Sequence, residues 1–434
     1  MTSAGRTVHL VNPPSAPGTT ANREGAAGLG VVYPSPGAFL YPPHTLATVL
    51  AALRRDRWDV RAYDAVVQEL GPELGKADAI GVFVSYATLD TDIAYISSLR
   101  QRFVGRIFAF GPSMRFLAEE LLERARVDHV LAGEAEGFCG QALELLMQSQ
   151  VPQRQVWWPK DVKATCCDDE GFILDLDTVP MPAWDALPYQ HYALLTVLGS
   201  RGCPDECAYC PYAAAQGHRF RARSVANVLD ELSWLADRFK PDRVVFRDPV
   251  FAHDEERVVA LCEGIMRRGI LLRWECESRP EHLNGSLLRL MQRAGCQWIK
   301  IGLETTDGTL LQSVGRLRHA HEVNAYLNQI AAVVSDSRSI GLNCRVFVMA
   351  GLAGQTEQSA HQTLRFLGQL RPGALNVKAC EPYPGTAALA ESPGQVQAQL
   401  DILSRAESAV RQAQSIGLLS RVKRWLRRRL GERR

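Results

Sequence analysis

Short apolar runs alternate with longer stretches of helical periodicity along most of this sequence. The pattern predicts an α/β protein with parallel strands. In the first third, the predicted strands are 8–11, 60–63, 79–84, 106–110 and 129–131, and the predicted helices are 42–53, 90–103 and 115–125. Turn residues such as Asn12-Pro13-Pro14 stop these strands. We therefore expect residues 1–150 to form a Rossmann-like, doubly wound parallel sheet.

The alternation resumes after a different kind of segment. Residues 151–192 are rich in proline, aspartate and tryptophan and are interpreted as a linker. Six further strands are then predicted at 194–198, 243–246, 271–275, 297–302, 343–348 and 374–380, with helices at 224–238, 255–268, 285–294, 322–336 and 357–370. This order favours a partial, TIM-like (β/α)6 barrel over residues 193–392. A helical segment with a basic tail is expected at 393–434.

Charge is concentrated at the C-terminal end of the chain. Residues 421–434 contain eight basic residues and one acid, which gives a net charge of +7. Because the whole chain has a net charge of +2, the other residues carry −5. A mildly acidic body argues against nucleic-acid binding. The tail places Val422, Trp425, Leu426 and Leu430 on one helical face, so it is a candidate for contact with an anionic membrane surface or a partner; the alternative is a solvated terminal helix.

The eleven cysteines indicate a reducing compartment. No stretch is long enough to span a membrane, and the N-terminus lacks the charged and apolar regions of a signal peptide. Cysteines in such a chain are expected to be reduced thiols or metal ligands. We therefore expect a cytoplasmic protein.

Three of those cysteines lie within eight positions, in the stretch "RGCPDECAYCPY". Cys203, Cys207 and Cys210 follow a predicted strand, and Pro-Asp-Glu at 204–206 is loop composition, not core composition. Structural zinc needs four ligands, and only His218 lies near enough to be a fourth. A 4Fe–4S cluster held by three thiolates would keep one iron open for a substrate or cofactor. The spacing favours the cluster.

The spacing Cys-x3-Cys-x2-Cys, with Tyr209 before the last cysteine, resembles the cluster motif of radical S-adenosylmethionine (SAM) enzymes. The resemblance covers residues 194 to about 389. It continues through "GHRFRARSVANVLDEL" (217–232), "FRDPVF" (246–251), "ECESRP" (275–280), "IKIGLETTD" (299–307), "FVMAGLAGQTE" (347–357) and "EPYPGTAAL" (381–389). Pro249, Ala353 and Gln355 depart from the usual pattern of the family.

The resemblance implies roles for several residues. The open iron would bind SAM, which is cleaved to a 5′-deoxyadenosyl radical, with electrons from a reductase or flavodoxin-type donor. By resemblance the SAM-binding residues are Tyr209, Glu304, Arg345, Gly351 and Gly354. Glu304 would hold the ribose or the amino group, and Arg345 the methionine carboxylate. The alternatives are that Glu304 and Arg345 form structural ion pairs and that the two glycines are simple turn residues.

Residues 8 to about 188 resemble the cobalamin-binding domain of class B radical SAM methyltransferases, through "LVNPP", "FGPSMRF", "VDHVLAGEAEGF" and the linker "LDTVPMPAWDALP". No Gly-x-Gly-x-x-Gly follows the first strand, so a dinucleotide site is not expected. By the switch-point rule, the candidate cobalamin contacts are Asn12, Ser85, Gly111, Gly133 and Glu134. No Asp-x-His-x-x-Gly occurs to coordinate cobalt, and a domain that binds nothing stays open.

Three functions remain in competition. The first is cobalamin-dependent methyl transfer to an unactivated carbon of a small molecule, in secondary-metabolite or lipid biosynthesis. The second is a radical diol dehydratase or ring-rearranging enzyme acting on an amino sugar, with no bound cobalamin. The third is a binding module that uses the cluster as a sensor, which does not explain the Gly-x-Glu at 302–304. The first is preferred, and no catalytic acid or base is assigned.

Overall fold

The computed structural model describes residues 6–35, 37–148, 154–387 and 392–429, with side chains up to Gln412. The strands are β1 (Thr7–Asn12), β2 (Thr20–Asn22), β3 (Val31–Tyr33), β4 (Asp59–Asp64), β5 (Ala79–Phe83), β6 (Arg106–Phe110), β7 (His129–Leu131), β8 (Gln155–Trp157), β9 (Leu195–Val197), β10 (Ser200–Arg201), β11 (Arg221–Ala222), β12 (Val244–Phe246), β13 (Trp274–Ser278), β14 (Cys296–Glu304), β15 (Asn343–Ala350) and β16 (Ala374–Ala379).

The helices are α1 (Gly25–Gly28), α2 (His44–Arg55), α3 (Leu89–Arg102), α4 (Met114–Arg124), α5 (Cys139–Leu146), α6 (Pro211–Gln216), α7 (Val225–Trp234), α8 (Glu255–Arg267), α9 (Gly285–Arg293), α10 (Gly308–Ser313), α11 (Val323–Ser339), α12 (Glu357–Leu370) and α13 (Pro393–Arg429). Contacts divide the chain into two compact units. Unit 1 is Met1–Pro204, Cys210–Pro249 and Tyr383–Gly385, and unit 2 is Asp205–Tyr209, Val250–Pro382 and Thr386–Arg434. The four-part division expected from the sequence stays a prediction.

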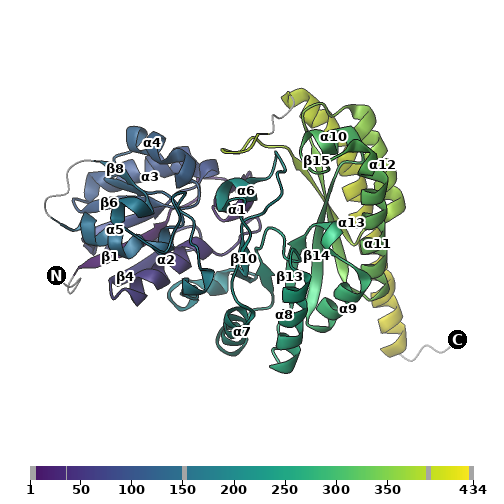
Figure 1. Cartoon of the computed structure of the whole chain (residues 1–434), viewed down its shortest axis with the longest axis horizontal. Helices are drawn as coiled ribbons and strands as arrows, with labels where there is room; N and C mark the ends of the chain where they lie inside the picture. The colour runs from purple at the N-terminus through teal and green to yellow at the C-terminus, as the bar shows by residue number, and fades with distance from the viewer. Residues whose placement is uncertain (1–5, 36, 149–153, 388–391, 430–434) are drawn as a thin grey trace. The chain divides into compact units, whose positions relative to one another are not determined.

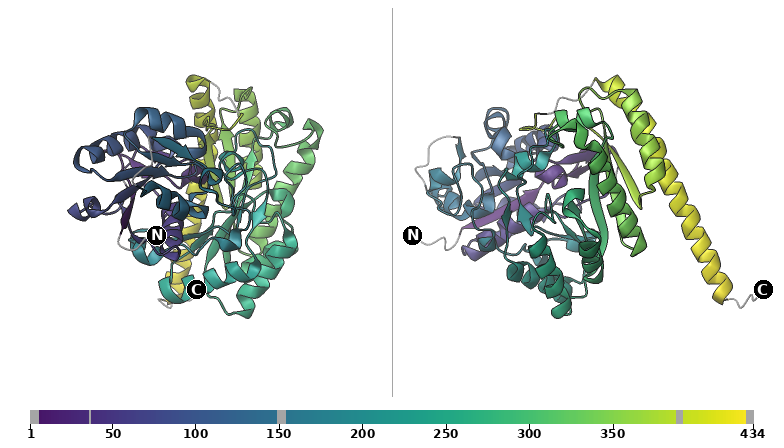
Figure 2. Two further views of the ribbon diagram at one scale, coloured as in Figure 1. Left: turned by 60° about the vertical axis from the view of Figure 1, so that its left-hand side comes forward. Right: turned by 45° about the vertical axis from the view of Figure 1, so that its right-hand side comes forward.

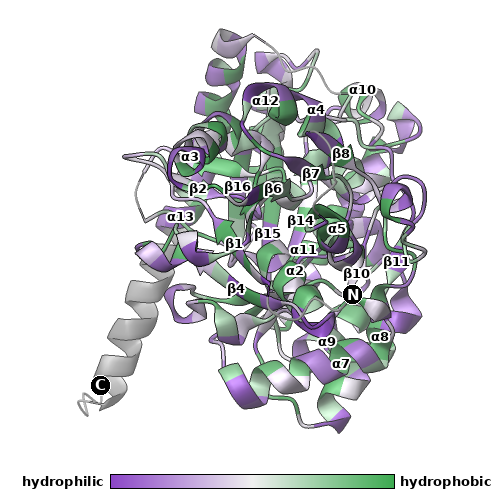
Figure 3. Ribbon diagram, turned by 90° about the vertical axis from the view of Figure 1, so that its left-hand side faces the viewer, coloured by the Kyte–Doolittle hydropathy of each residue, from purple (hydrophilic) through white to green (hydrophobic). Residues whose placement is uncertain are grey.

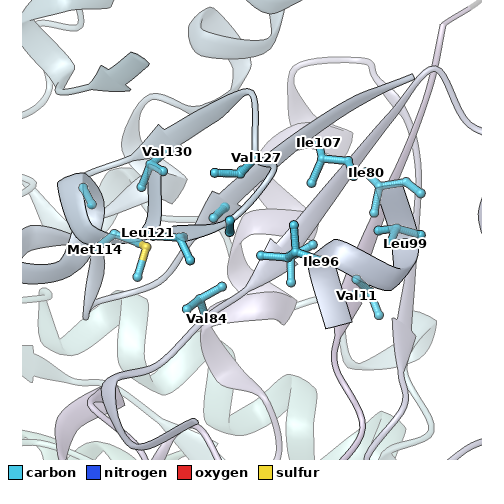
Figure 4. Packing of buried hydrophobic residues seen from close by; sticks show 14 of the residues in the cluster. Val11, Ile80, Val84, Ile96, Leu99, Ile107, Met114, Leu121, Val127 and Val130 are labelled. Atoms are coloured by element: carbon cyan, nitrogen blue, oxygen red, sulfur yellow. The ribbon is translucent and has the colours of Figure 1, made fainter. Parts of the chain in front are cut away.

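Unit 1 contains a six-stranded sheet in the order β4-β1-β5-β6-β7-β8, and every pair in it is parallel. The order reverses between β1 and β5, which confirms the predicted doubly wound sheet. Figure 1 shows α3 and α4 on one side of this sheet and α2 on the other. On the side of α3 and α4, buried side chains of both helices and of four strands form one apolar cluster (Figure 4).

The same unit contains β9 and β12, which pair in parallel. Two short antiparallel pairs, β2 with β3 and β10 with β11, complete its strands. Helix α7 of this unit alternates between hydrophobic and hydrophilic stretches (Figure 3), as expected for a helix with one buried face. The predicted linker is partly strand, because β8 within it forms the edge of the six-stranded sheet.

Unit 2 contains four parallel strands in the order β16-β15-β14-β13. Figure 1 shows α11, α12 and α13 beside these strands, and Figure 2 shows α13 as one long yellow helix. With β9 and β12, six parallel strands alternate along the chain with helices, which confirms the predicted (β/α)6 order.

The predicted strand at 271–275 begins too early. Leu271, whose apolar side chain suggested a strand, is 92% exposed, and β13 starts three residues later. Among the described residues, no helix has both the length and the apolar composition needed to span a bilayer.

Candidate active site

The cysteine loop begins at a glycine that is needed for its conformation. Gly202 follows β10 with a φ of +78°, and a Cβ at this position would lie 2.1 Å from the carbonyl oxygen of Arg219. The backbone N–H of Cys203 then donates to the carbonyl of Gly217 at 3.0 Å. Positive φ and close backbone approach both require glycine here. At the other end, Cys210 immediately precedes α6, whose first residue is proline, as is common for a helix start.

None of the three cysteines of the loop forms a disulfide. Cys203 is buried, whereas Cys207 and Cys210 are half-buried. The sulfur of Cys207 lies 3.7 Å from Nη1 of Arg279 and 3.9 Å from the carbonyl oxygen of Gly315. A cationic guanidinium therefore lies beside one of the three sulfurs.

Arg279 is fixed in this position by neighbours in unit 2. Its guanidinium forms ion pairs with Asp205 at 3.1 Å and Glu281 at 2.9 Å, and it donates to the carbonyl oxygen of Arg316 at 2.9 Å. Arg279 was not predicted as a site residue, although it lies directly after β13 in the quoted "ECESRP". Its place at the end of a barrel strand was the available signal.

The chemistry of these donors fits an iron–sulfur cluster, because three cysteine sulfurs outside any disulfide and an adjacent cation suit a thiolate-bound centre. Among the described residues, however, no three His, Cys, Asp or Glu side chains are arranged to hold a metal ion. The assignment of Cys203, Cys207 and Cys210 as ligands therefore stays a prediction.

Tyr209 and Glu304, selected separately in the sequence, lie together in unit 2. Tyr209 packs against the apolar cluster of Val314, Met349 and Leu352. Its hydroxyl hydrogen-bonds to the Glu304 carboxylate and is one of the influences that lower the pKa of that acid. Glu304 ends β14 with a φ of +63°, a conformation that non-glycine residues rarely adopt and that is often found at functional sites.

The Gly-x-Glu pattern has a steric explanation. A Cβ on Gly302 would lie 2.1 Å from Oε1 of Glu304, so the carboxylate occupies the space that a side chain at 302 would fill. Arg316 donates to the carbonyl of Gly302 at 3.2 Å and to the hydroxyl of Tyr326 at 3.0 Å. Tyr326 in turn donates to the Gly302 carbonyl at 2.7 Å. Arg316 and Tyr326 were not predicted as site residues, because no periodic pattern distinguishes them.

Burial controls the ionisation of this acid. Glu304 is 7% exposed, and desolvation raises its pKa above the usual value, by more than the charge of Arg316 and the Tyr209 hydrogen bond lower it. Desolvation raises the pKa of Tyr209 as well. A buried carboxylate with a nearby guanidinium can accept hydrogen bonds from hydroxyl or ammonium groups. The site is therefore chemically suited to the ribose or amino group of SAM, which stays a prediction.

The turn after β15 contains Gly351 and Gly354. The backbone N–H of Gly351 donates to Oε1 of Gln355 at 2.7 Å and to Oε1 of Gln399 at 2.6 Å. The amide of Gln355 also donates to the Met349 carbonyl at 3.1 Å. Gln355, which departs from the family pattern, is therefore part of a buried network that fixes the turn. Adenine contact by the two glycines stays a prediction.

Arg345 lies at the other end of the same sheet. It is the third residue of β15 and pairs in register with Lys300, whereas Glu304 pairs with Val348. Its guanidinium lies 5.0 Å from the centre of the Trp298 ring, and its Nε has no hydrogen-bond partner among the described residues. The structure thus does not bring Arg345 together with Tyr209 and Glu304. Its predicted contact with the methionine carboxylate is untested.

In unit 1, Asn12 and Ser85 belong to a buried polar network at the switch point. Arg23 donates to Oδ1 of Asn12 at 3.0 Å and pairs with Asp92 at 2.5 Å. The Ser85 backbone N–H donates to Asp92 at 3.3 Å, and its hydroxyl lies 2.7 Å from that of Thr88. These predicted cobalamin contacts therefore already have partners within the unit.

Gly111, Gly133 and Glu134 line one cavity of about 60 Å³ in unit 1. Glu134 forms ion pairs with Arg201 at 3.2 Å and Arg221 at 2.8 Å. Three of the five predicted cobalamin contacts thus come together, but the space that they enclose is too small for a corrin ring. Their part in cobalamin binding stays a prediction.

Comparison with known proteins agrees with the sequence resemblance. Residues 197–367 match the Radical SAM superfamily. The uncharacterized methyltransferase PH0819 of Pyrococcus horikoshii is 24% identical over 362 residues, covering 80% of this chain and 77% of that protein. The hopanoid C-3 methylase of Methylococcus capsulatus is 25% identical over 379 residues, covering 82% of this chain and 70% of the methylase.

A solved structure extends the comparison to the fold. The radical SAM methyltransferase TsrM from Kitasatospora setae, with cobalamin and a 4Fe–4S cluster bound, superposes with a TM-score of 0.67 at 16% identity. The match covers 89% of this chain and 74% of TsrM, and at this identity it shows a shared fold alone. The cysteine loop, the Gly-x-Glu site and the superfamily match lead to one conclusion: residues 197–367 of this chain form a radical SAM domain, which uses a 4Fe–4S cluster and SAM.

Proposed function

We propose that this enzyme is a cobalamin-dependent methyltransferase that methylates an unactivated carbon of a small molecule in secondary-metabolite or lipid biosynthesis. The observation that carries the proposal is the extent of the similarity. Two proteins named as a methyltransferase and a methylase match 80% and 82% of the chain, far beyond the radical SAM domain at 197–367. The N-terminal sheet is therefore part of what this chain shares with methylating relatives.

The residues of unit 2 have defined tasks in this proposal. With the cluster and SAM bound, cleavage of the sulfonium supplies a carbon radical that removes a hydrogen atom from the substrate. Arg279 places positive charge against the Cys207 sulfur, and Glu304 presents a buried acceptor beside Tyr209. Gln355 and Gln399 fix the turn after β15. These residues bind and orient, and the cofactors supply the reactive species.

The competing function is a radical dehydratase or ring-rearranging enzyme that acts on an amino sugar and binds no cobalamin. Its support is the small cavity at Gly111, Gly133 and Glu134. The two relatives that match about four fifths of the chain are named as methylating enzymes, which favours methyl transfer instead. The two functions differ in whether cobalamin binds and in which product of SAM accumulates.

The test is anaerobic reconstitution of the full chain with iron, sulfide and hydroxocobalamin, followed by incubation with a reductant and SAM that bears a deuterated methyl group. We expect near-stoichiometric cobalamin, a deuterated methyl group on cobalt, and S-adenosylhomocysteine. An intact cluster with no bound cobalamin, and 5′-deoxyadenosine as the only SAM product, would instead assign the chain to the dehydratase or rearrangement class.

Two cysteine variants control the measurement. Cys207→Ala should lose iron, sulfide and all SAM turnover, because it removes one predicted cluster ligand. Cys166→Ala, at a half-buried cysteine outside the loop, should retain iron, sulfide and SAM turnover. Equal cluster content in the two variants would contradict the ligand assignment.

A further inference from the structure

A groove in unit 2 lies away from every residue assigned above. It is a cavity of about 810 Å³, within the range of small-molecule sites. Helices α11, α12 and α13 contribute its walls, and the segments before β15 and β16 form one end. The apolar lining residues are Val334, Leu342, Leu364, Leu367, Ala406, Ala409 and Val410.

The groove has three arginines and no acidic side chain among its described lining residues. Arg338, Arg371 and Arg405 each come from a different segment, and all three are exposed. No carboxylate forms a salt bridge with any of them within the described part of the chain. Arg338 donates to the carbonyl oxygens of Leu370 and Arg371, at 2.9 Å and 2.5 Å, which fixes it at the end of α12.

The position of the groove separates it from the predicted SAM site. Its residues Asn343 and Cys344 begin β15, whereas Gly351 follows the end of that strand. Parallel strands place all their amino ends at one edge of the sheet and their carboxyl ends at the other. The groove is therefore at the amino edge, and the Glu304 site is at the carboxyl edge.

Helix α13, which supplies one wall, extends to Arg429 and so includes most of the basic segment at 421–434. The side chains of that segment lie outside the described residues. Clusters of basic residues attract anionic lipid surfaces by roughly 1 kcal/mol per residue. The composition adds positive charge to the same helix that borders the groove.

We propose that this groove binds an anionic phospholipid of a membrane surface, with the acyl chain against its apolar walls and the phosphate on Arg338, Arg371 and Arg405. A groove with apolar walls and three arginines suits an amphiphile that carries its negative charge at one end. Guanidinium groups bind phosphate through paired hydrogen bonds. Three guanidinium groups that form no salt bridge with a described carboxylate raise the local anion concentration. This lipid site is independent of the proposed methyl transfer.

The experiment is co-sedimentation of the full chain with vesicles of phosphatidylcholine containing about 30 mol% phosphatidylglycerol, compared with pure phosphatidylcholine vesicles. We expect binding to the anionic vesicles only. The variant Arg338→Gln/Arg371→Gln/Arg405→Gln should weaken this binding roughly 100-fold, since each arginine near the surface contributes about a factor of five. The control Arg289→Gln/Arg293→Gln/Arg318→Gln removes three exposed arginines elsewhere and should change binding less than about threefold.

A second variant tests the acyl chain. Gly368 lines the groove within α12, and a Cβ there would meet no atom within 4 Å. Gly368→Leu should fold normally and fill the channel while keeping all three arginines. We expect it to weaken binding to the anionic vesicles about tenfold or more.

Three results would overturn the proposal. If the arginine variant binds anionic vesicles like the wild type, the basic segment at 421–434 alone is responsible. If Gly368→Leu binds undiminished, no acyl chain enters the groove. If inorganic phosphate displaces the protein from vesicles while chloride at equal ionic strength does not, the arginines form a site for a free anion, not for a lipid.

Discussion

The two parallel sheets differ in how many of their faces are apolar. Every residue of β6 in unit 1 from 107 to 110 is fully buried, with Ile107 and Ala109 in the cluster of Figure 4. In β14 of unit 2, Ile299 and Ile301 are fully buried, but the alternating positions carry Trp298, Lys300 and Glu304. The first sheet is covered by apolar packing on both faces, and the second has one face of charged and aromatic groups.

The charged side chains on this face of the unit 2 sheet contact one another and an aromatic ring. Lys300 lies 3.5 Å from both Glu275 and Glu277, and Arg345 stacks on Trp298. A fully apolar strand can hold only packing residues, whereas an alternating strand can present polar groups to a ligand without exposing its core. The predicted SAM residues Glu304 and Arg345 lie on this polar face.

The largest expected effect is the loss of a core ring in unit 1. Phe108→Ala removes a fully buried aromatic ring from β6 and should lower the free energy of unfolding by about 3–5 kcal/mol. Phe347→Ala removes a half-buried ring from β15 and should lower the free energy of unfolding by about 1 kcal/mol, less than half of the loss expected for Phe108→Ala. Urea unfolding followed by circular dichroism measures both. Equal losses would contradict the contrast between the sheets.

The buried ion pair of unit 1 should give the next largest effect. Both side chains of Arg23 and Asp92 are inaccessible to solvent, so Arg23→Met strands a buried carboxylate and should cost about 3 kcal/mol. The double variant Arg23→Met/Asp92→Leu should recover most of that stability, since no unpaired charge remains. Thermal unfolding of the three proteins is the measurement, and a double variant less stable than the single one would contradict this account.

Most of the fold could be predicted because local patterns determine it. β6, β7 and α12 have the predicted bounds, since an apolar run or amphipathic period ends at a clear turn signal in each case. The short β8 was missed within a proline-rich stretch, because the other strands of the sheet stabilise it more than its own sequence does. The antiparallel pair of β2 and β3 was missed because each strand has only three residues, too few for an alternating pattern.

The site was only partly predictable. Tyr209 and Glu304 carry family motifs, and the structure brings them together. Arg279 lies in the quoted "ECESRP" but was not selected, and Arg316 and Gln399 lie in no recognised pattern. All three matter through contacts between residues far apart in the chain, which periodicity does not encode. Arg345 fits the family by its strand, but its position along that strand depends on register, which the sequence does not specify.

A smaller effect is expected at the polar face of unit 2. Gly302→Ala places a methyl group 2.1 Å from the Glu304 carboxylate and must displace it. SAM affinity of the reconstituted enzyme should fall by on the order of tenfold to 100-fold, which corresponds to one hydrogen bond to a charged group. Gly368→Ala, in open space on α12, is the matched control and should leave SAM affinity unchanged. Unchanged affinity for both variants would remove Glu304 from the SAM site.

The smallest effect is a pH dependence of stability that only a buried acid produces. The pKa of Glu304 is raised by burial, more than Arg316, Tyr209 and Lys378 together lower it. Between the unfolded value near 4.5 and this raised value, the folded chain keeps a proton that the unfolded chain has released. Ionisation of Glu304 therefore lowers stability as pH rises through that window.

The variant Glu304→Gln removes this titration, so its unfolding free energy should gain on that of the wild type as pH rises from about 4 to about 8. The difference should be constant below the unfolded pKa and again above the folded one. If the difference instead shrinks as pH rises, Arg316 stabilises the carboxylate more than burial opposes it. The polar face would then hold Glu304 ionised as part of an ion pair, and the contrast between the two sheets would be one of charge pairing more than of desolvation.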